Sequence, residues 1–224
     1  MPPGWWQQQL LGATAIAVWL TMLSGLAIVV RRRWPMQPEW SRKLVHIGAG
    51  PVVLLAWWLG IDRVIAIAAA GAITLIAAMN HSLRLLPAVE DVGRQSYGTI
   101  AYGASITCLL WLFWPWEAAA VAAGVMVMAC GDGLAGLLGP AIASPSWTVL
   151  GQRKSVVGTG VMAVASLGVL LVLRQLSALH GDHPSLEVIA AIALAAVLLE
   201  QCAIAGLDNF TVPMVVGGLW NQFG

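Results

Sequence analysis

Residues 10–30 read LLGATAIAVWLTMLSGLAIVV, and Arg31, Arg32 and Arg33 follow them directly. No charged side chain interrupts this run, and about 20 consecutive apolar residues suffice for an α-helix to cross the hydrocarbon core of a bilayer. No basic residue precedes the run, whereas a cleaved signal peptide begins with a positively charged region. We therefore expect a retained membrane span here, with lipid rather than water as the solvent of the fold.

The composition extends this prediction to the whole chain. Of the 224 residues, 59% are hydrophobic and only 9% are charged, and the mean hydropathy is +0.83. Such a chain has too little polar surface for a soluble globule. The apolar runs predict an all-α, polytopic membrane protein of about seven transmembrane helices, folded as one domain over residues 1–224. The expected spans are residues 9–30, 44–60, 62–79, 98–114, 117–131, 157–179 and 186–205.

A last apolar stretch, residues 210–219, is shorter than a bilayer span. Pro213 and the pair Gly217-Gly218 also interrupt it. We expect this stretch to be re-entrant or interfacial, because backbone with broken hydrogen bonding is tolerated at membrane depth only inside protein or beside water.

Basic residues predict the orientation, because cytoplasmic connections carry an excess of Lys and Arg. With seven spans, only Arg63 and Arg174 fall on the side of the N-terminus, which is therefore expected outside. The opposite face holds Arg31, Arg32, Arg33, Arg42, Lys43, Arg84, Arg94, Arg153 and Lys154. Tryptophans mark the same two interfaces. Trp5, Trp6, Trp57, Trp58, Trp114 and Trp116 fall near the outer one, and Trp34, Trp40 and Trp147 near the inner one.

Net charge and cysteine usage argue against a nucleic-acid-binding protein, a disulfide framework and a zinc site. The net charge is only +1, whereas a nucleic-acid partner requires Lys and Arg concentrated on an exposed face. Cys108, Cys130 and Cys202 lie in or beside apolar runs, so neither a disulfide framework nor a zinc site is indicated.

Five polar clusters interrupt the apolar pattern, and counting spans places all of them on the cytoplasmic face. Three of them precede expected spans whose amino ends point to the cytoplasm. These ends carry Lys43, Arg94 and Lys154 next to Gly48, Gly98 and Gly158. Free backbone N–H groups and the positive end of the helix dipole favour phosphate at such positions. The five clusters are Arg42-Lys43-Leu-Val-His46, residues 94–99, Gly131-Asp132-Gly133, residues 153–159 and Gly206-Leu-Asp208-Asn209.

The other two clusters follow expected spans and place Asp132 and Asp208 beside carboxyl ends. Carboxylates and free carbonyls favour a hard cation, most simply Mg²⁺ bound together with nucleotide phosphates. Basic groups, a magnesium site and a base together make up the apparatus for phosphoryl transfer. Asp132 or His46 could serve as that base.

Structural interpretations of the same residues stay open. Lys43 and Lys154 could simply set the topology, and Asp208 with Asn209 could cap a helix. His46 could be structural, and Glu200 could be a snorkelling or hydrogen-bonded side chain near the end of the seventh span.

Taken together, these motifs resemble the CTP-dependent lipid-alcohol kinases, the family that includes phytol kinase and dolichol kinase. The resemblance covers residues 42–213 and is closest to the phytol kinase type. The motifs that carry it are Arg42-Lys-x-x-His46, Arg94-x-Ser-x-Gly-Thr99, Gly131-Asp-Gly-x-Ala135, Lys154-Ser-x-x-Gly158-Thr and Glu200 followed by Asp208-Asn209 and Pro213.

The resemblance implies an activity and roles for named residues. It implies Mg²⁺, CTP or UTP as the donor, and an isoprenoid alcohol such as phytol as the acceptor, in a bacterial, possibly cyanobacterial, inner or thylakoid membrane. By the same resemblance the catalytic candidates are Asp132 and His46, with Glu200 as a further site residue. The nucleotide phosphates would be bound by Lys43, Arg94, Ser96, Gly98, Lys154, Ser155 and Gly158. The metal would be held by Asp132, Asp208 and Asn209.

Three alternatives remain. Phosphatidate cytidylyltransferases share the Gly-Asp and Lys-Ser arrangement, but their His-Gly-Gly and Asp-Arg-x-Asp segment has no counterpart here. A dolichol or diacylglycerol kinase would use the same apparatus on another lipid alcohol. A lipid-phosphate transporter would need polar residues reaching the outer side, whereas the ionisable residues cluster at one interface.

Overall fold

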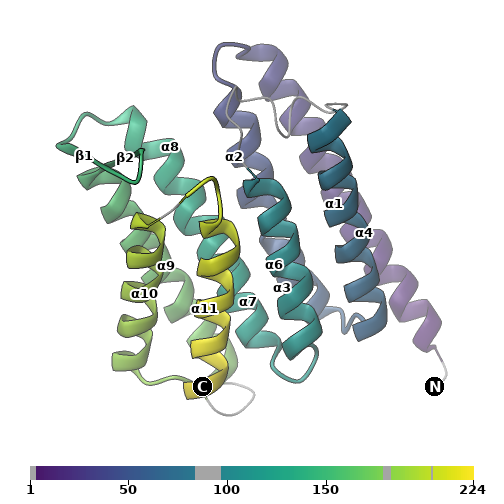
Figure 1. Ribbon diagram of the computed structural model, residues 1–224. Helices are drawn as coiled ribbons and strands as arrows, with labels where there is room; N and C mark the ends of the chain where they lie inside the picture. Colours follow the sequence, from purple (N-terminus) through teal and green to yellow (C-terminus); the bar gives the residue numbers. More distant parts are fainter. Residues whose placement is uncertain (1–3, 84–96, 179–182, 203) are drawn as a thin grey trace.

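The computed structural model is a bundle of helices with one short hairpin in the part of the chain that it describes, residues 4–83, 97–178, 183–202 and 204–224 (Figure 1). Its helices are α1 (Trp5–Arg33), α2 (Pro38–Ala49), α3 (Pro51–Trp58), α4 (Arg63–Leu83), α6 (Gly98–Phe113), α7 (Ala118–Val127), the π-helical turn η1 (Met128–Asp132), α8 (Gly133–Ala141), α9 (Val156–Ala178), α10 (Leu186–Gln201) and α11 (Asp208–Phe223). The hairpin pairs β1 (Ser146–Val149) with β2 (Gln152–Ser155). The all-α prediction is confirmed apart from this hairpin.

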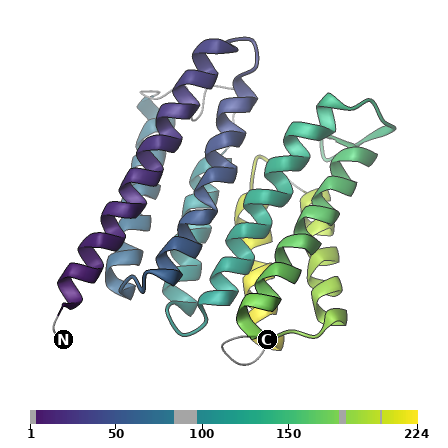
Figure 2. The same ribbon diagram turned by 180° about the vertical axis from the view of Figure 1, so that it is seen from behind.

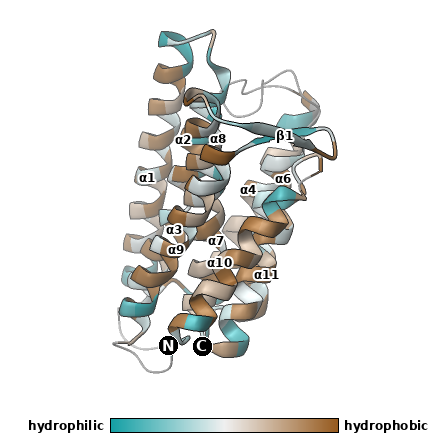
Figure 3. Ribbon diagram, turned by 90° about the vertical axis from the view of Figure 1, so that its left-hand side faces the viewer, coloured by the Kyte–Doolittle hydropathy of each residue, from teal (hydrophilic) through white to brown (hydrophobic). Residues whose placement is uncertain are grey.

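Four of the described helical segments are long and apolar enough to cross a membrane. Figure 3 shows hydrophobic residues along the middle of the helices and hydrophilic residues gathered towards their ends. This is the pattern of a protein whose surface faces hydrocarbon at mid-height and water at both ends. The chain is therefore a membrane protein. The four segments are Trp5–Arg33, Arg63–His81, Ala118–Ala141 and Val156–Ala178.

Apart from α2 with α3 and α7 with α8, which continue in the same direction, successive helices alternate in direction, so the bundle has two distinct ends (Figures 1 and 2). One end carries the β1–β2 hairpin and is called the hairpin end; the other carries both chain termini and is called the terminal end. The last turn of α1, with Arg31, Arg32 and Arg33, lies at the hairpin end. Arg63, the first residue of α4, lies at the terminal end. The described basic residues thus separate as the sequence predicts.

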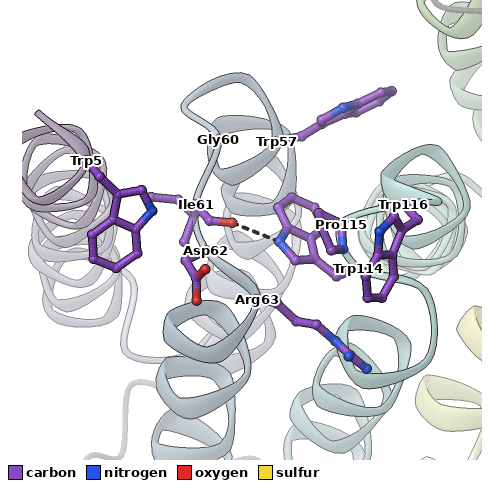
Figure 4. Close-up of a pocket in the computed structure, with 9 residues that line it drawn as sticks. All are labelled: Trp5, Trp57, Gly60, Ile61, Asp62, Arg63, Trp114, Pro115 and Trp116. Carbon is purple, nitrogen blue, oxygen red and sulfur yellow. Dashed lines mark hydrogen bonds between the residues drawn. The ribbon is translucent and has the colours of Figure 1, made fainter. Parts of the chain in front are cut away.

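Tryptophans gather at the terminal end, where they line a cavity of about 380 Å³ (Figure 4). The indole nitrogen of Trp114 donates a hydrogen bond to the backbone oxygen of Ile61 at 2.9 Å. The Arg63 guanidinium lies 5.1 Å from the centre of the Trp116 ring, close enough for a cation–π contact. Amphipathic aromatic rings with one snorkelling cation are typical of a membrane interface. The cavity is lined by Trp5, Trp57, Gly60, Ile61, Asp62, Arg63, Trp114, Pro115 and Trp116.

The prediction of one continuous span over residues 44–60 is wrong. Helix α2 ends at Ala49, and α3 begins at Pro51 after Gly50. Proline has no backbone N–H to continue the helical hydrogen bonding, and it disfavours helical geometry in the residue before it. The result is two shorter helices stacked end to end, with the polar cluster of Lys43 and His46 on the first of them.

The prediction that the fifth span ends at residue 131 is also wrong. Helix α7, the turn η1 and α8 form one uninterrupted helical segment, Ala118–Ala141. Asp132 therefore lies inside a helix, not beside its carboxyl end. A Cβ on Gly131 would collide with Met162, and one on Gly133 would collide with Ile47. These glycines allow neighbouring helices to pack closely, and the helix continues through them.

The expected interruption of residues 210–219 is a further correction. Helix α11 runs without interruption over 16 residues, which is about 24 Å, and it packs inside the bundle against α6, α7 and α10. Val212, Val216 and Trp220 are buried on it. Tertiary packing has overridden the local helix-breaking tendency of Pro213.

Helix α7 is the centre of the bundle. Its residues 120–125 are all buried, and most of them are alanine or glycine, which lets neighbouring helices approach closely. In lipid, packing contacts of this kind replace much of the hydrophobic driving force between helices. Gly217 of α11 is one such contact point, because a Cβ there would lie 2.7 Å from the Leu109 side chain and 3.0 Å from the Ala120 carbonyl oxygen.

We expect Gly217→Ala to lower the free energy of unfolding by about 1–3 kcal/mol through overpacking. Gly218→Ala is the matched control, because a Cβ at that neighbouring position meets nothing within 4 Å. Thermal unfolding of the two purified variants in detergent, followed by tryptophan fluorescence, measures the difference. Equal midpoints would show that α11 does not pack closely against α6 and α7.

Candidate active site

A buried ion pair joins α2 to the central helical segment. Lys43 Nζ lies 2.6 Å from Asp132 Oδ2 and also donates to the Asp132 carbonyl oxygen at 3.1 Å. Both side chains are largely buried, with 6% and 16% of their surface exposed. Charges removed from water in this way are stable only when paired and hydrogen-bonded. The pair fixes the carboxylate of Asp132 against α2.

His46, one helical turn after Lys43, completes this cluster. Its Nε2 lies 3.4 Å from Asp132 Oδ2 and 3.2 Å from the Met128 carbonyl oxygen. Because both neighbours are acceptors, the favoured neutral tautomer carries its proton on Nε2 and leaves Nδ1 as an acceptor. The His46 ring also stacks on Tyr102 of α6, with ring centres 4.3 Å apart. His46 is therefore held from two sides.

Local backbone chemistry explains why these side chains can meet. Asp132 closes a π-helical turn, a feature found frequently at functional sites, and Met128, whose carbonyl faces His46, opens the same turn. A Cβ on Gly136, one turn further along α8, would collide with the Lys43 side chain. Gly136 therefore provides the space through which Lys43 reaches Asp132.

A second buried ion pair lies at the amino end of α9. Lys154 Nζ is 2.5 Å from Glu200 Oε1 and also donates to the Glu200 carbonyl oxygen. Gln201 extends this pair, because its Nε2 donates to Glu200 Oε2 at 2.9 Å and to Thr159 Oγ1 at 3.0 Å. Glu200 is therefore not a snorkelling residue; it is the hydrogen-bonded ion-pair partner of Lys154.

The hairpin positions Lys154 at this point. Leu150 and Gly151, the two residues of its turn, both have positive φ, as the tight turns that suit twisted strands require. Lys154 and Ser155 occupy the end of β2, and α9 begins at the next residue. The Gly158 N–H donates to Ser155 Oγ at 3.1 Å. The predicted cluster of Lys154, Ser155 and Gly158 therefore forms the start of α9.

Asp208 and Asn209 are the first two residues of α11, and both are buried. The sequence placed Asp208 at the carboxyl end of the preceding span, and this is wrong, because α10 ends earlier, at Gln201. A carboxylate at an amino end is stabilised by the helix dipole. Asp208 lies close enough to Asp132, Lys154 and Lys43 to interact with them electrostatically. Asn209 Nδ2 donates to the Gly206 carbonyl oxygen at 3.2 Å.

The remaining predicted residues belong to the connection before α6. Arg94 and Ser96 lie outside the described residues. Gly98 is the buried first residue of α6, and the N–H of the preceding residue, Tyr97, donates to the Ala205 carbonyl oxygen at 3.1 Å. The amino end of α6 is thereby tied to the loop that leads into α11.

The oxygen donors fit a magnesium ion that is shared with a nucleotide. Among the described residues, no three His, Cys, Asp or Glu side chains form a metal-binding group. A dedicated all-protein cage is therefore not built from them. Mg²⁺, however, is usually bound through one or two carboxylates together with substrate phosphates. Asp132 and Asp208 supply two largely buried carboxylates that interact electrostatically with one another.

Sequence reasoning missed Tyr102 and Gln201 as members of the site, and it included Thr159 in a motif without assigning it a role. Tyr102 is buried, and its hydroxyl donates to the Val125 carbonyl oxygen at 3.3 Å. A polar side chain inside an apolar span is itself a signal of a buried contact, so Tyr102 could have been found. Gln201 follows Glu200 directly, and Thr159 follows Gly158, but only the fold brings their side chains together.

Comparison with known proteins now decides the family. A phytol kinase from Synechocystis sp. is 40% identical to the chain over 205 residues, which cover 89% of this chain and 87% of that protein. The chain belongs to the phytol kinase family. The family resemblance predicted from the five polar clusters is thereby confirmed. No protein-family model matches the chain, and no solved structure matches it.

Membership of the phytol kinase family directs attention to the hairpin end of the bundle. There, six side chains of three chemical kinds come together from segments distant in the sequence: the lysines Lys43 and Lys154, the carboxylates Asp132, Glu200 and Asp208, and the imidazole of His46. Alternating cations and carboxylates of this kind can bind phosphate, bind a divalent cation and accept a proton.

The Lys154–Glu200 pair gives a test of the site's construction. We expect Lys154→Met and Glu200→Gln each to lower the free energy of unfolding by about 3–5 kcal/mol, because each leaves one buried group without its partner. The double variant should lose less than the sum of the two. Thermal unfolding in detergent completes this double-mutant cycle.

Arg153→Met is the control for that cycle, since the Arg153 side chain is exposed and its guanidinium donates to the Ser146 hydroxyl. It should change stability by less than about 0.5 kcal/mol. Strictly additive losses at positions 154 and 200 would contradict a direct ion pair.

Proposed function

We propose that this chain is a membrane-embedded kinase that transfers the terminal phosphoryl group of CTP, or UTP, to phytol and forms phytyl phosphate. The observation that carries the proposal is the 40% identity to a phytol kinase over 89% of the chain. The paired lysines and carboxylates at the hairpin end support it, because they are the groups that phosphoryl transfer uses.

The nucleotide phosphates bind, in this proposal, by replacing the carboxylates as partners of the two lysines. Lys43 and Lys154 already lie in charge-assisted contacts with Asp132 and Glu200. A phosphate oxygen offers a lysine the same type of interaction, so each ammonium keeps an anionic partner, and the carboxylate that it leaves is compensated by the bound Mg²⁺ or by a proton. The N–H groups at the amino end of α9, near Ser155 and Gly158, add further donors for an anion.

The transfer itself needs a base and an in-line arrangement of the attacking and leaving oxygens about the phosphorus. The phytol hydroxyl oxygen forms a bond to the terminal phosphorus, the bond from that phosphorus to the bridging oxygen breaks, and the nucleoside diphosphate leaves. We assign Asp132 as the acceptor of the hydroxyl proton, since the Lys43 exchange frees its carboxylate inside the bundle. His46, at 3.4 Å from Asp132 Oδ2, orients that carboxylate and is the alternative base through Nδ1.

Asp208 and Asn209, with Asp132, are the residues that would hold Mg²⁺. When bound, Mg²⁺ would neutralise charge on the nucleotide phosphates. The electrostatic interaction of Asp208 with groups of both ion pairs supports this assignment.

We place the hairpin end in the cytoplasm and the N-terminus outside. The excess of Lys and Arg at the hairpin end supports this orientation, and it exposes the site to the cytoplasmic nucleotide pool. The cyanobacterial source of the phytol kinase relative favours an inner or thylakoid membrane as the location.

A labelled-nucleotide assay tests the proposed function. We expect the purified protein, with Mg²⁺ and phytol, to transfer label from the γ position of CTP into lipid. No lipid should be labelled from the α position. The assay runs in parallel with UTP as donor and with dolichol, diacylglycerol and phosphatidate as acceptors. Label from the α position in lipid would identify a cytidylyltransferase instead, and no transfer to any alcohol would reject the kinase.

Asp132→Asn tests the assignment of the base. We expect it to reduce kcat for phytol by about 10²–10⁴-fold, because the amide cannot accept the hydroxyl proton. Glu187→Gln is the matched control, since Glu187 is an exposed carboxylate in the first turn of α10, and it should keep wild-type kcat. Near-normal turnover by Asp132→Asn, in protein that elutes as the wild type does on size exclusion, would reject the assignment.

A further inference from the structure

An apolar cleft of about 330 Å³ lies between α1, α3, α4 and α6. Its lining is almost entirely aliphatic, and many of the lining residues are small, among them Ala17, Ala49, Ala66, Ala69 and Gly103. Protein interiors contain few voids larger than a water molecule. Small-molecule pockets, by contrast, begin at about 300 Å³. The size of this cleft is therefore that of a binding site, not that of a packing defect.

One end of the cleft meets the active site. Ala49, which lines it, lies one helical turn after His46 on α2, and Gly103 directly follows Tyr102 on α6. Val125 also lines the cleft, and its carbonyl oxygen accepts the Tyr102 hydroxyl. This end of the cleft therefore lies beside the stacked rings of His46 and Tyr102.

The cleft extends from there towards the terminal end. Along α4 it is lined from Thr74 back to Ile65, and it reaches Ile61, which also lines the tryptophan cavity. At about 1.5 Å per residue, the α4 stretch alone spans roughly 14 Å. The Thr74 hydroxyl, a polar group in the lining, is already engaged with the Ala70 carbonyl oxygen and Thr107. The cleft therefore offers a long apolar path that leaves the site towards the middle of the bilayer.

We infer that this cleft binds the hydrocarbon tail of the alcohol and selects isoprenoid chains by length and branching. The inference rests on the proposed kinase function, and it adds where the acceptor lies. With the tail in the cleft, the hydroxyl is delivered beside His46, whose Nε2 is 3.4 Å from Asp132 Oδ2. Lipid tails are as apolar as the acceptor's tail, so shape, not hydrophobicity, must provide the selectivity.

The spacing of small residues in the cleft matches an isoprenoid chain. Ala13 and Ala17 lie one turn apart on α1, and Ala66 and Ala70 lie one turn apart on α4; all four line the cleft. A helical turn advances about 5.4 Å. An extended isoprenoid chain carries one methyl branch per isoprene unit, or on the order of every 5 Å given carbon–carbon bonds of roughly 1.5 Å. Successive methyl branches can therefore occupy the spaces next to successive alanines.

Ala69→Phe tests the inference by placing a large ring in the cleft. Ala69 lines the cleft and is exposed to it, so the ring fills ligand space without overpacking the core. We expect kcat/KM for phytol to fall by about tenfold or more. The shorter isoprenoid alcohol geraniol should be affected far less. The wild type should also use phytol better than unbranched hexadecanol, and Ala69→Phe should reduce that preference.

Ala68→Phe is the matched control. Ala68 is the adjacent residue of α4, is equally exposed and does not line the cleft, so its chain-length profile should equal that of the wild type. Identical profiles for the two variants, with phytol still phosphorylated, would overturn the cleft assignment and leave the kinase standing. Failure of the wild type to phosphorylate any isoprenoid alcohol would instead reject the kinase and, with it, the assignment.

A labelling measurement that does not depend on turnover accompanies the kinetics. A phytol analogue with a photoreactive diazirine in its tail should label peptides from α1 and α4, and excess phytol should suppress the labelling. Ala69→Phe should lower the labelling of α4, and Ala68→Phe should not. Labelling confined to α9 or α10, or labelling insensitive to phytol, would overturn the inference.

Discussion

A charge buried in an apolar bundle must find a partner, and the Lys43–Asp132 pair meets this requirement on the central helical segment. The 2.6 Å contact joins α2 to the segment Ala118–Ala141, around which the other helices pack. Leaving either group alone in a low-dielectric interior would cost several kcal/mol. The glycines at positions 133 and 136, the π-helical turn before them and the stacking of His46 on Tyr102 all surround this one contact.

The site repeats this arrangement. Lys154 and Glu200 form a second cation–carboxylate pair at the start of α9, and Asp208 lies near groups of both pairs. Both lysines are held in place by these pairs, and the proposed exchange of a carboxylate for a phosphate gives each ammonium a new charge partner. Electrostatic positioning of this kind is the main contribution that a protein makes to phosphoryl transfer.

The division of the molecule into two ends matches the two proposed substrates. The hairpin end collects the ionisable groups, whereas the apolar cleft runs from His46 and Tyr102 towards the tryptophans of the terminal end. A polar donor and an apolar acceptor could thus reach the same carboxylate from opposite directions. Family membership and geometry therefore favour the same chemistry, transfer to a lipid alcohol.

The sequence by itself determined the membrane class, the helical content and the one-sided gathering of polar clusters, because each follows from composition or spacing along the chain. The five polar clusters were also sufficient to predict the family. Only the tertiary structure decided which lysine pairs with which carboxylate, since partners 89 and 46 positions apart meet through packing alone. It likewise decided that Asp132 lies within a helix, that Asp208 begins one, and that α11 continues through Pro213. Close packing against α6 and α7 outweighs the local preferences of glycine and proline there, and no local pattern contains that information.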